Sequence, residues 1–97
     1  MKILAVTSCP LGLVYTHLAK EALLKSADKL RIDIKVETQG EIQSDVIGAK
    51  DIKEAVAVIL TNDMPIDNIE RFEGLSKIYV SCKDIINNSE DIIKKII

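Results

Sequence analysis

The sequence has no tryptophan, one phenylalanine and two tyrosines, so stacking on aromatic side chains is not expected to dominate ligand recognition. Its one histidine and two distant cysteines form no Cys-x-x-Cys motif and no cluster with metal-ligand spacing, so neither a metal nor a cofactor is expected. Thirteen basic residues against fifteen acidic ones give a formal net charge of -2. That balance gives no basic surface for nucleic acid and no polybasic patch for a membrane.

Long apolar runs are also missing. The run after Met1 and Lys2 is about five residues long, too short for a signal peptide or a membrane span. We therefore expect a cytosolic protein whose thiols stay reduced. Hydrophobic residues nevertheless make up 47% of the 97 residues, which is enough for one domain, residues 1–97, with its own core.

Strand and helix patterns alternate along the chain. Apolar runs predict strands at 2–7, 56–60 and 78–80, and an alternating pattern predicts a strand with one polar face at 32–38. A polar loop is expected from there to about Gly48. Helical patterns occur over four segments: 16–30, 49–54, about 65–72, and 83–96. The middle of the last segment is weakened by Asn87, Asn88 and Ser89.

This order predicts an α/β fold, a Rossmann-like three-layer sandwich with helices on both faces of a four-stranded parallel sheet. We expect the strand order 2-1-3-4, with the half-polar second strand at an edge. Ligands of such sheets bind at the carboxyl ends of the strands, beside the switch between strands 1 and 3. Residues at those ends are Cys9, the pair Gln39 and Gly40, and the pair Asn62 and Asp63.

Cys9 ends the first strand and faces the start of the first helix, where α/β folds bind phosphate. Inward amide groups of the following loop and the helix N-terminus favour the thiolate and can hold a dianion. Gly12 allows positive φ and close backbone approach, and the Thr16 hydroxyl can donate to the sulfur or to a bound oxygen. The predicted phosphate-binding residues are Pro10, Leu11, Gly12, Leu13, Val14, Tyr15 and Thr16.

The thiol phosphatase pattern is Cys-x5-Arg-Ser/Thr, and here Tyr15 stands where that pattern has its arginine. The guanidinium is the main clamp on a phosphoryl transition state. Its absence favours a loop that holds a phosphoryl group on Cys9 over one that hydrolyses a phosphate ester.

Two blocks of sequence resemble the cytosolic IIB component of the bacterial fructose-specific sugar phosphotransferase system. Residues 6–23 read V-T-S-C-P-L-G-L-V-Y-T-H-L-A-K-E-A-L, close to that family's V-T-A-C-P-T-G-I-A-H-T-x-M-A-A-E-A-L. Residues 35–40 read K-V-E-T-Q-G, as in the family. Weaker similarities extend the resemblance over nearly the whole chain.

The resemblance implies that Cys9 is a phosphocysteine. It would receive phosphate from a phosphohistidine on a IIA partner and pass it to sugar bound by a IIC partner in the membrane, which would hold this component at the inner face. Two positions depart from the family pattern. Leu11 replaces a threonine, and Tyr15 replaces a histidine while His17 follows two residues later. Backbone binding of phosphate should tolerate both changes.

Other residues are weaker candidates for the rim of the site. His17 can contact phosphate or a partner, Gln39 and Gly40 can border the loop, and Asp63 can act as an acid or, more simply, cap the next helix. Cys82 is interpreted as structural or incidental. Two alternatives to the carrier stay open, a low-molecular-weight thiol phosphatase and a non-catalytic regulatory module with an inert Cys9.

Overall fold

The fold was analysed in a computed structural model that describes residues 1–40 and 43–97. The predicted polar loop before Gly48 lies partly outside the described residues. The strands are β1 (Lys2–Thr7), β2 (Asp33–Thr38), β3 (Ala55–Thr61) and β4 (Ser76–Val80). The helices are α1 (Leu13–Lys29), α2 (Ala49–Glu54), the 3-10 turn η1 (Ile69–Phe72) and α3 (Cys82–Ile96).

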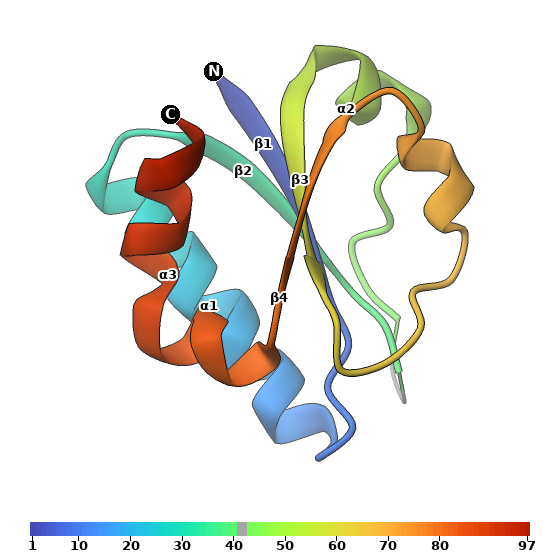
Figure 1. Cartoon of the computed structure of the whole chain (residues 1–97), viewed down its shortest axis with the longest axis vertical. Coiled ribbons are helices and arrows are strands. Elements are labelled where there is room, and N and C mark those ends of the chain that lie inside the picture. The colour runs from blue at the N-terminus through green and yellow to red at the C-terminus, as the bar shows by residue number, and fades with distance from the viewer. Residues whose placement is uncertain (41–42) are drawn as a thin grey trace.

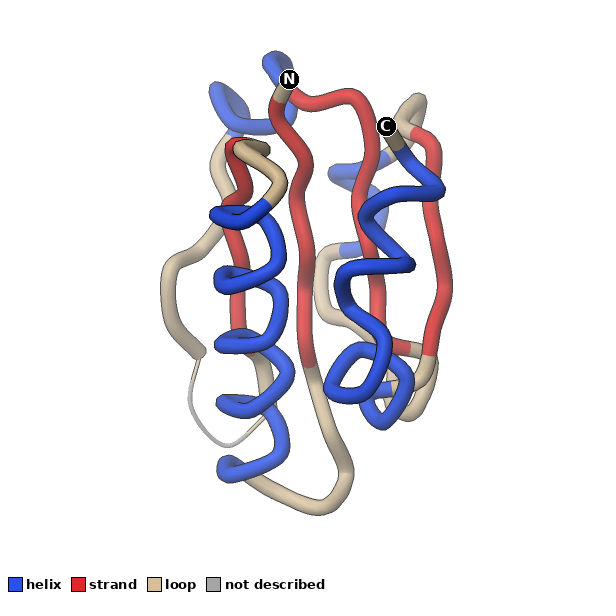
Figure 2. Tube along the Cα trace, turned by 90° about the vertical axis from the view of Figure 1, so that its left-hand side faces the viewer, coloured by secondary structure: helices blue, strands red, loops and turns tan. Residues whose placement is uncertain are grey.

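The four strands form one parallel sheet in the order β2-β1-β3-β4, as the sequence predicts. The apolar strands β1 and β3 occupy the centre, where both faces of the sheet are covered. Helices α1 and α3 cover one face side by side, and α2 and η1 lie on the other (Figures 1 and 2). The predicted three-layer sandwich is therefore confirmed.

Each face of the sheet has its own core. On one side, Ala19, Leu23 and Ala27 of α1 pack with Ile85 and Ile93 of α3 against the sheet. The small alanine side chains let α1 approach the strands closely. On the other side, a second cluster joins the sheet to the segment around α2 and η1: Leu4, Val6, Ile47, Val58, Leu60 and Phe72.

Two helices differ clearly from the sequence prediction, and a third has the predicted weak point. Helix α1 begins at Leu13, three residues before the predicted start. The helix expected over 65–72 is reduced to the single turn η1. Helix α3 has a non-helical residue at Asn88 (φ −136°, ψ 29°), so the predicted weak point in its middle is confirmed as a kink.

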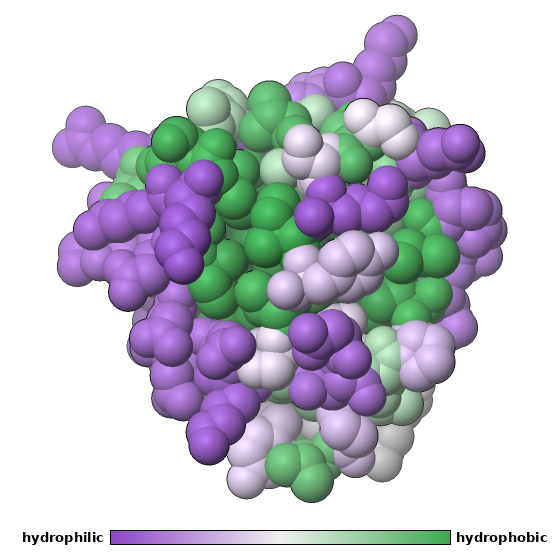
Figure 3. Space-filling model, in the orientation of Figure 1, coloured by the Kyte–Doolittle hydropathy of each residue, from purple (hydrophilic) through white to green (hydrophobic). Residues whose placement is uncertain are grey.

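The sheet edge at β4 faces the viewer in Figure 1, and Figure 3 shows apolar residues across the middle of that view with hydrophilic ones on either side. Tyr79 of β4 and Val56 of β3 are each about half exposed. Among the described residues, no helix combines the length and apolar character that crossing a bilayer requires.

Candidate functional site at the carboxyl edge of the sheet

The carboxyl ends of all four strands lie at the lower end of the molecule in Figure 1, together with the first turns of α1 and α3. Cys9 follows β1, Asp63 follows β3 and Cys82 follows β4. Thr61 at the end of β3 fixes the residue before Cys9, because its hydroxyl accepts from the Ser8 amide (2.9 Å) and donates to the Ser8 carbonyl (3.2 Å). The parallel topology thus gathers residues that are distant in sequence.

The loop after Cys9 is a tight turn into α1. The Gly12 amide donates to the Cys9 carbonyl at 3.1 Å, and Gly12 itself has φ 103° and ψ −172°. That region of backbone conformation is nearly restricted to glycine. Gly12 therefore takes the positive φ that the sequence analysis noted a glycine allows.

Helix α1 opens with amides that have no acceptor within the helix. The Thr16 amide makes the first helical bond, to the Gly12 carbonyl at 3.2 Å, so the amides of Leu13, Val14 and Tyr15 precede the hydrogen-bond ladder. Together with the positive end of the helix dipole, these amides favour an anion on the loop side. The side chains of Leu13, Val14 and Tyr15 are exposed, so only their backbone suits phosphate.

Thr16 is buried and holds Cys9 in place. Its hydroxyl oxygen accepts a hydrogen bond from the Cys9 amide at 3.2 Å. The sequence predicts that this hydroxyl donates to the sulfur or to a bound oxygen. The hydrogen bond to the Cys9 amide uses the oxygen as acceptor and leaves the hydroxyl proton for such a contact.

Two cavities flank the Cys9 loop. The first, about 380 Å³, lies on the α1 side and is lined by Cys9, Pro10, Gly12, Leu13, Thr16, Gln39, Gly40 and Met64. The structure therefore brings Gln39 and Gly40 to the same cavity as the loop. The second, about 410 Å³, is lined by Cys9, Pro10, Leu11, Tyr15, Asp63, Lys83, Ile86 and Asn87. Lys83 of α3 is a cation that sequence reasoning missed.

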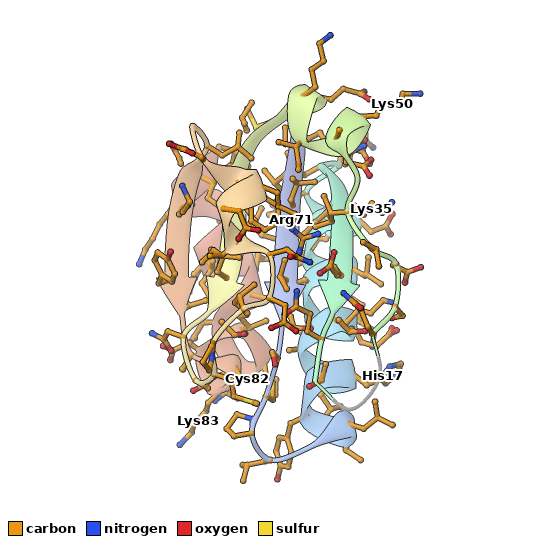
Figure 4. All side chains as sticks on the ribbon, turned by 90° about the vertical axis from the view of Figure 1, so that its right-hand side faces the viewer. His17, Lys35, Lys50, Arg71, Cys82 and Lys83 are labelled. Atoms are coloured by element: carbon orange, nitrogen blue, oxygen red, sulfur yellow. A yellow bond between two sulfur atoms is a disulfide. The ribbon has the colours of Figure 1, made fainter. Side chains whose placement is uncertain are left out.

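Cys9 and Cys82 are joined by a disulfide bond, with their Cα atoms 6.0 Å apart. This corrects the expectation that the thiols stay reduced, and of the two interpretations of Cys82, structural or incidental, it contradicts the incidental one. The reason is topological, since β1 and β4 end at the same edge and residues 73 apart in sequence meet there. Figure 4 shows Cys82 and Lys83 at the end of the molecule where the Cys9 loop runs.

Of the candidate rim residues Asp63 and His17, the first lies at the site and the second points away from it. One carboxylate oxygen of Asp63 accepts from the Cys82 amide at 2.6 Å, so Asp63 binds the first turn of α3, whose own N-cap residue is Ser81, and not the segment that the sequence predicted. His17 projects from the exposed side of α1, away from Cys82 (Figure 4), with its Nε2 3.9 Å from a carboxylate oxygen of Glu21. As far as the described residues define them, neither cavity is lined by His17.

The second sequence block builds a buried polar cluster beside the site. Glu37 is fully buried and forms two hydrogen bonds with the Arg71 guanidinium, at 2.6 and 2.7 Å. The Gln39 side chain donates to Glu37 and binds both the amide and the carbonyl of Asp67. Burial raises the pKa of Glu37, but the bonds from Arg71, Gln39 and the Ile47 amide outweigh it and lower that pKa below its usual range. This cluster fixes the loop after β3 against β2.

The site thus combines a sulfur at a strand end, helix amides that precede the hydrogen-bond ladder, and a loop sequence without a guanidinium. A family model described as PTS system, Lactose/Cellobiose specific IIB subunit matches residues 4–95. The chain belongs to the IIB family of the sugar phosphotransferase system. IIB components of this system are phosphotransferases, and the family favours the phosphoryl carrier over the thiol phosphatase and the non-catalytic module.

Relatives agree with this assignment over the whole chain. The chain is 40% identical to a fructose-specific EIIB component of Haloferax volcanii over 98% of its own length and 60% of that protein. It is 41% identical to a fructose-like EIIB component of Escherichia coli K12, over 98% of its own length and 91% of that protein. A solved domain of a fructose-specific IIABC component from Borrelia burgdorferi has a TM-score of 0.90 and 43% identity, covering 97% of this chain and 90% of that one.

In this IIB component, Gly12→Ala should weaken both stability and the anion site. An added Cβ meets no atom within 4 Å, so the penalty comes from the backbone conformation alone. We expect a loss of about 1–3 kcal/mol in the free energy of unfolding, measured by urea titration. Gly48→Ala is the matched control, because Gly48 has φ −100° and equally open space. Equal losses in the two variants would contradict the strain argument.

Proposed function

We propose that Cys9, in its reduced form, accepts a phosphoryl group from a phosphohistidine of a IIA protein and passes it to sugar bound by a membrane IIC protein. The observation that carries this proposal is the position of Cys9, one tight turn before the first-turn amides of α1, which precede the helix hydrogen-bond ladder. Fructose or a fructose-like sugar is the proposed substrate, because the relatives from Haloferax volcanii and Escherichia coli are named for it.

In the first transfer, the Cys9 thiolate attacks the phosphorus of the phosphohistidine in line with the leaving imidazole nitrogen. The S–P bond forms as the N–P bond breaks. The amides of Leu13, Val14 and Tyr15 and the Thr16 hydroxyl donate hydrogen bonds that stabilise the negative charge on the equatorial oxygens. Because these groups are fixed by the turn and the helix, they need little reorganisation during the transfer.

In the second transfer, a sugar hydroxyl attacks the same phosphorus and the Cys9 thiolate leaves. The IIC protein supplies the base for that hydroxyl. Hydrolysis is slow because Tyr15 stands where a thiol phosphatase has its arginine, and Asp63 is engaged by the Cys82 amide. The thiophosphate is therefore held until the sugar arrives.

Exposed apolar side chains around the loop suit the docking of protein partners. Leu11 and Val14 are 74% and 68% exposed, and Tyr15 and Leu18 are each 44% exposed. A surface of this kind beside a reacting atom fits two partners that bind in turn. We place the chain as a single IIB domain, residues 1–97, in the cytoplasm at the inner face of the membrane, where it contacts IIC.

The test is transfer of labelled phosphate from a phosphorylated IIA protein to the reduced chain. We expect one phosphoryl group per chain, located by mass spectrometry on the peptide that contains Cys9. An aryl phosphate should not be turned over by the isolated chain. Label on His17, the single histidine, or rapid turnover of the aryl phosphate would contradict the proposal.

A further inference from the structure

We propose that Cys82 is a resolving thiol, and that the Cys9–Cys82 disulfide is a reversible oxidative modification that switches the phosphoryl acceptor off. The inference rests on the proposed function of Cys9. Sγ of Cys9 can bond to phosphorus or to the sulfur of Cys82, so phosphorylation and disulfide formation exclude each other. The chain has two cysteines, and this one bond uses both.

The backbone at both cysteines is held by hydrogen bonds that do not depend on the disulfide. The Cys9 amide is bound by the Thr16 hydroxyl at 3.2 Å, and the Cys82 amide is bound by the Asp63 carboxylate at 2.6 Å. These anchors come from α1 and from the end of β3. The Cα separation of 6.0 Å is within the ordinary range for disulfides, so reduction leaves both thiols in place to close again.

The surroundings suit thiol chemistry at both positions. Cys82 is the first residue of α3, and Cys9 lies one turn before α1, so each sulfur is near the positive end of a helix. Lys83 adds a cation to the cavity that Cys9 lines. When Cys82 is reduced, the Tyr15 carbonyl oxygen, 3.6 Å from its Sγ, can accept from the thiol and keep the side chain beside the loop.

Access is provided by the two cavities on either side of Cys9, of about 380 and 410 Å³. Each is larger than a hydroperoxide. The sulfurs themselves are mostly shielded, since Cys9 and Cys82 are each 6% exposed. A small oxidant therefore reaches Cys9 where a phosphohistidine would, and a bound phosphoryl group would shield the sulfur from it.

The oxidant we name is a hydroperoxide. The Cys9 thiolate attacks one peroxide oxygen, the O–O bond breaks, and Cys9 becomes a sulfenic acid while the other oxygen leaves as hydroxide or alkoxide. The Cys82 thiolate then attacks Sγ of Cys9, the S–S bond forms and the S–O bond breaks, releasing hydroxide. The two sulfurs lose two electrons in total, and the peroxide gains them. A thiol such as glutathione reverses the change by two exchange steps.

The test compares the wild-type chain with Cys82→Ser, both fully reduced at the start and then treated with hydrogen peroxide. In the wild type we expect free thiols to fall from two to none, the chain to stay monomeric on a non-reducing gel, and phosphate acceptance to be lost. Millimolar glutathione should restore both. Cys82→Ser should accept phosphate normally when reduced, but peroxide should carry Cys9 to sulfinic acid, which glutathione does not reverse.

Three results would overturn the switch: two thiols remaining in the treated wild type, a disulfide that glutathione cannot open, or recovery of Cys82→Ser to the wild-type level. Counting free thiols measures disulfide formation independently of phosphate transfer. If the reduced wild type closes its disulfide but never accepts phosphate, the proposed function fails while the resolving role of Cys82 stands. If it accepts phosphate and never closes the disulfide, the switch alone fails.

Discussion

Replacing Cys9 with serine should lower phosphate acceptance from the phosphorylated IIA protein to below about a thousandth of the wild-type rate. The hydroxyl of serine stays protonated where the thiol ionises, and among the described residues neither candidate base is directed at it. Asp63 is bound to the Cys82 amide, and His17 projects away from the loop. The initial rate of label transfer, with all proteins reduced, is the measurement.

Cys82→Ser is the matched control for this experiment. Both serine variants lose the disulfide, which closes a loop of 73 residues and is worth about 4 kcal/mol in the chain-entropy view. Under reducing conditions neither the variants nor the wild type has that bond. A difference between the two variants in the rate of label transfer therefore reports the loss of the Cys9 nucleophile and not the loss of the disulfide. Labelling of Cys9→Ser at the wild-type rate would contradict the phosphocysteine mechanism.

The sheet and the Cys9 loop could be predicted because their signals are local. Buried parallel strands read as continuous apolar runs, and Gly12 shares one short motif with Cys9 and Thr16. The first three residues of α1 could not be predicted in this way. Leu13, Val14 and Tyr15 are exposed apolar residues, so they do not belong to the amphipathic stripe by which the helix was found.

The rest of the site depends on contacts between distant segments. Cys82 reaches Cys9 only because β4 is parallel to β1 with β3 between them. The sequence left Asp63 as either an acid or a cap of the next helix, and only the fold shows that its carboxylate binds the first amide of α3. The strand order explains why the carboxyl ends of β1, β3 and β4 lie at one edge. It does not predict which side chains are in contact there.

For Glu37, the sequence pattern predicted the place in the sheet but not the burial of the side chain. Alternation placed it on the polar face of an edge strand, and β2 is at the edge. The carboxylate is nevertheless fully buried, because Arg71 reaches it from η1 and Gln39 and the Ile47 amide complete its hydrogen bonds. The K-V-E-T-Q-G block is thereby explained as a support for the loop that carries Asp63 and Met64.

Arg71→Met should therefore lower the free energy of unfolding by about 3–5 kcal/mol at neutral pH, because it leaves a buried carboxylate without its charged partner. The guanidinium is directed across the sheet face toward β2 (Figure 4). Urea titration of the reduced proteins measures the loss. Lys50→Met is the matched control, since it removes one positive charge from an exposed position of α2.

The same variant should reverse the pH dependence that Glu37 contributes. In the wild type the pKa of Glu37 is lowered from its ordinary 4.5, so its stabilisation is present above that pH and is lost as the pH falls through the folded pKa. Without Arg71, burial dominates and raises the pKa above 4.5, so folding is favoured below that pH and weakened as the pH rises. The difference between wild type and Arg71→Met should thus widen from acidic to neutral pH. A difference that stays constant with pH, while Lys50→Met loses little, would mean that Arg71 acts by packing and not by its charge.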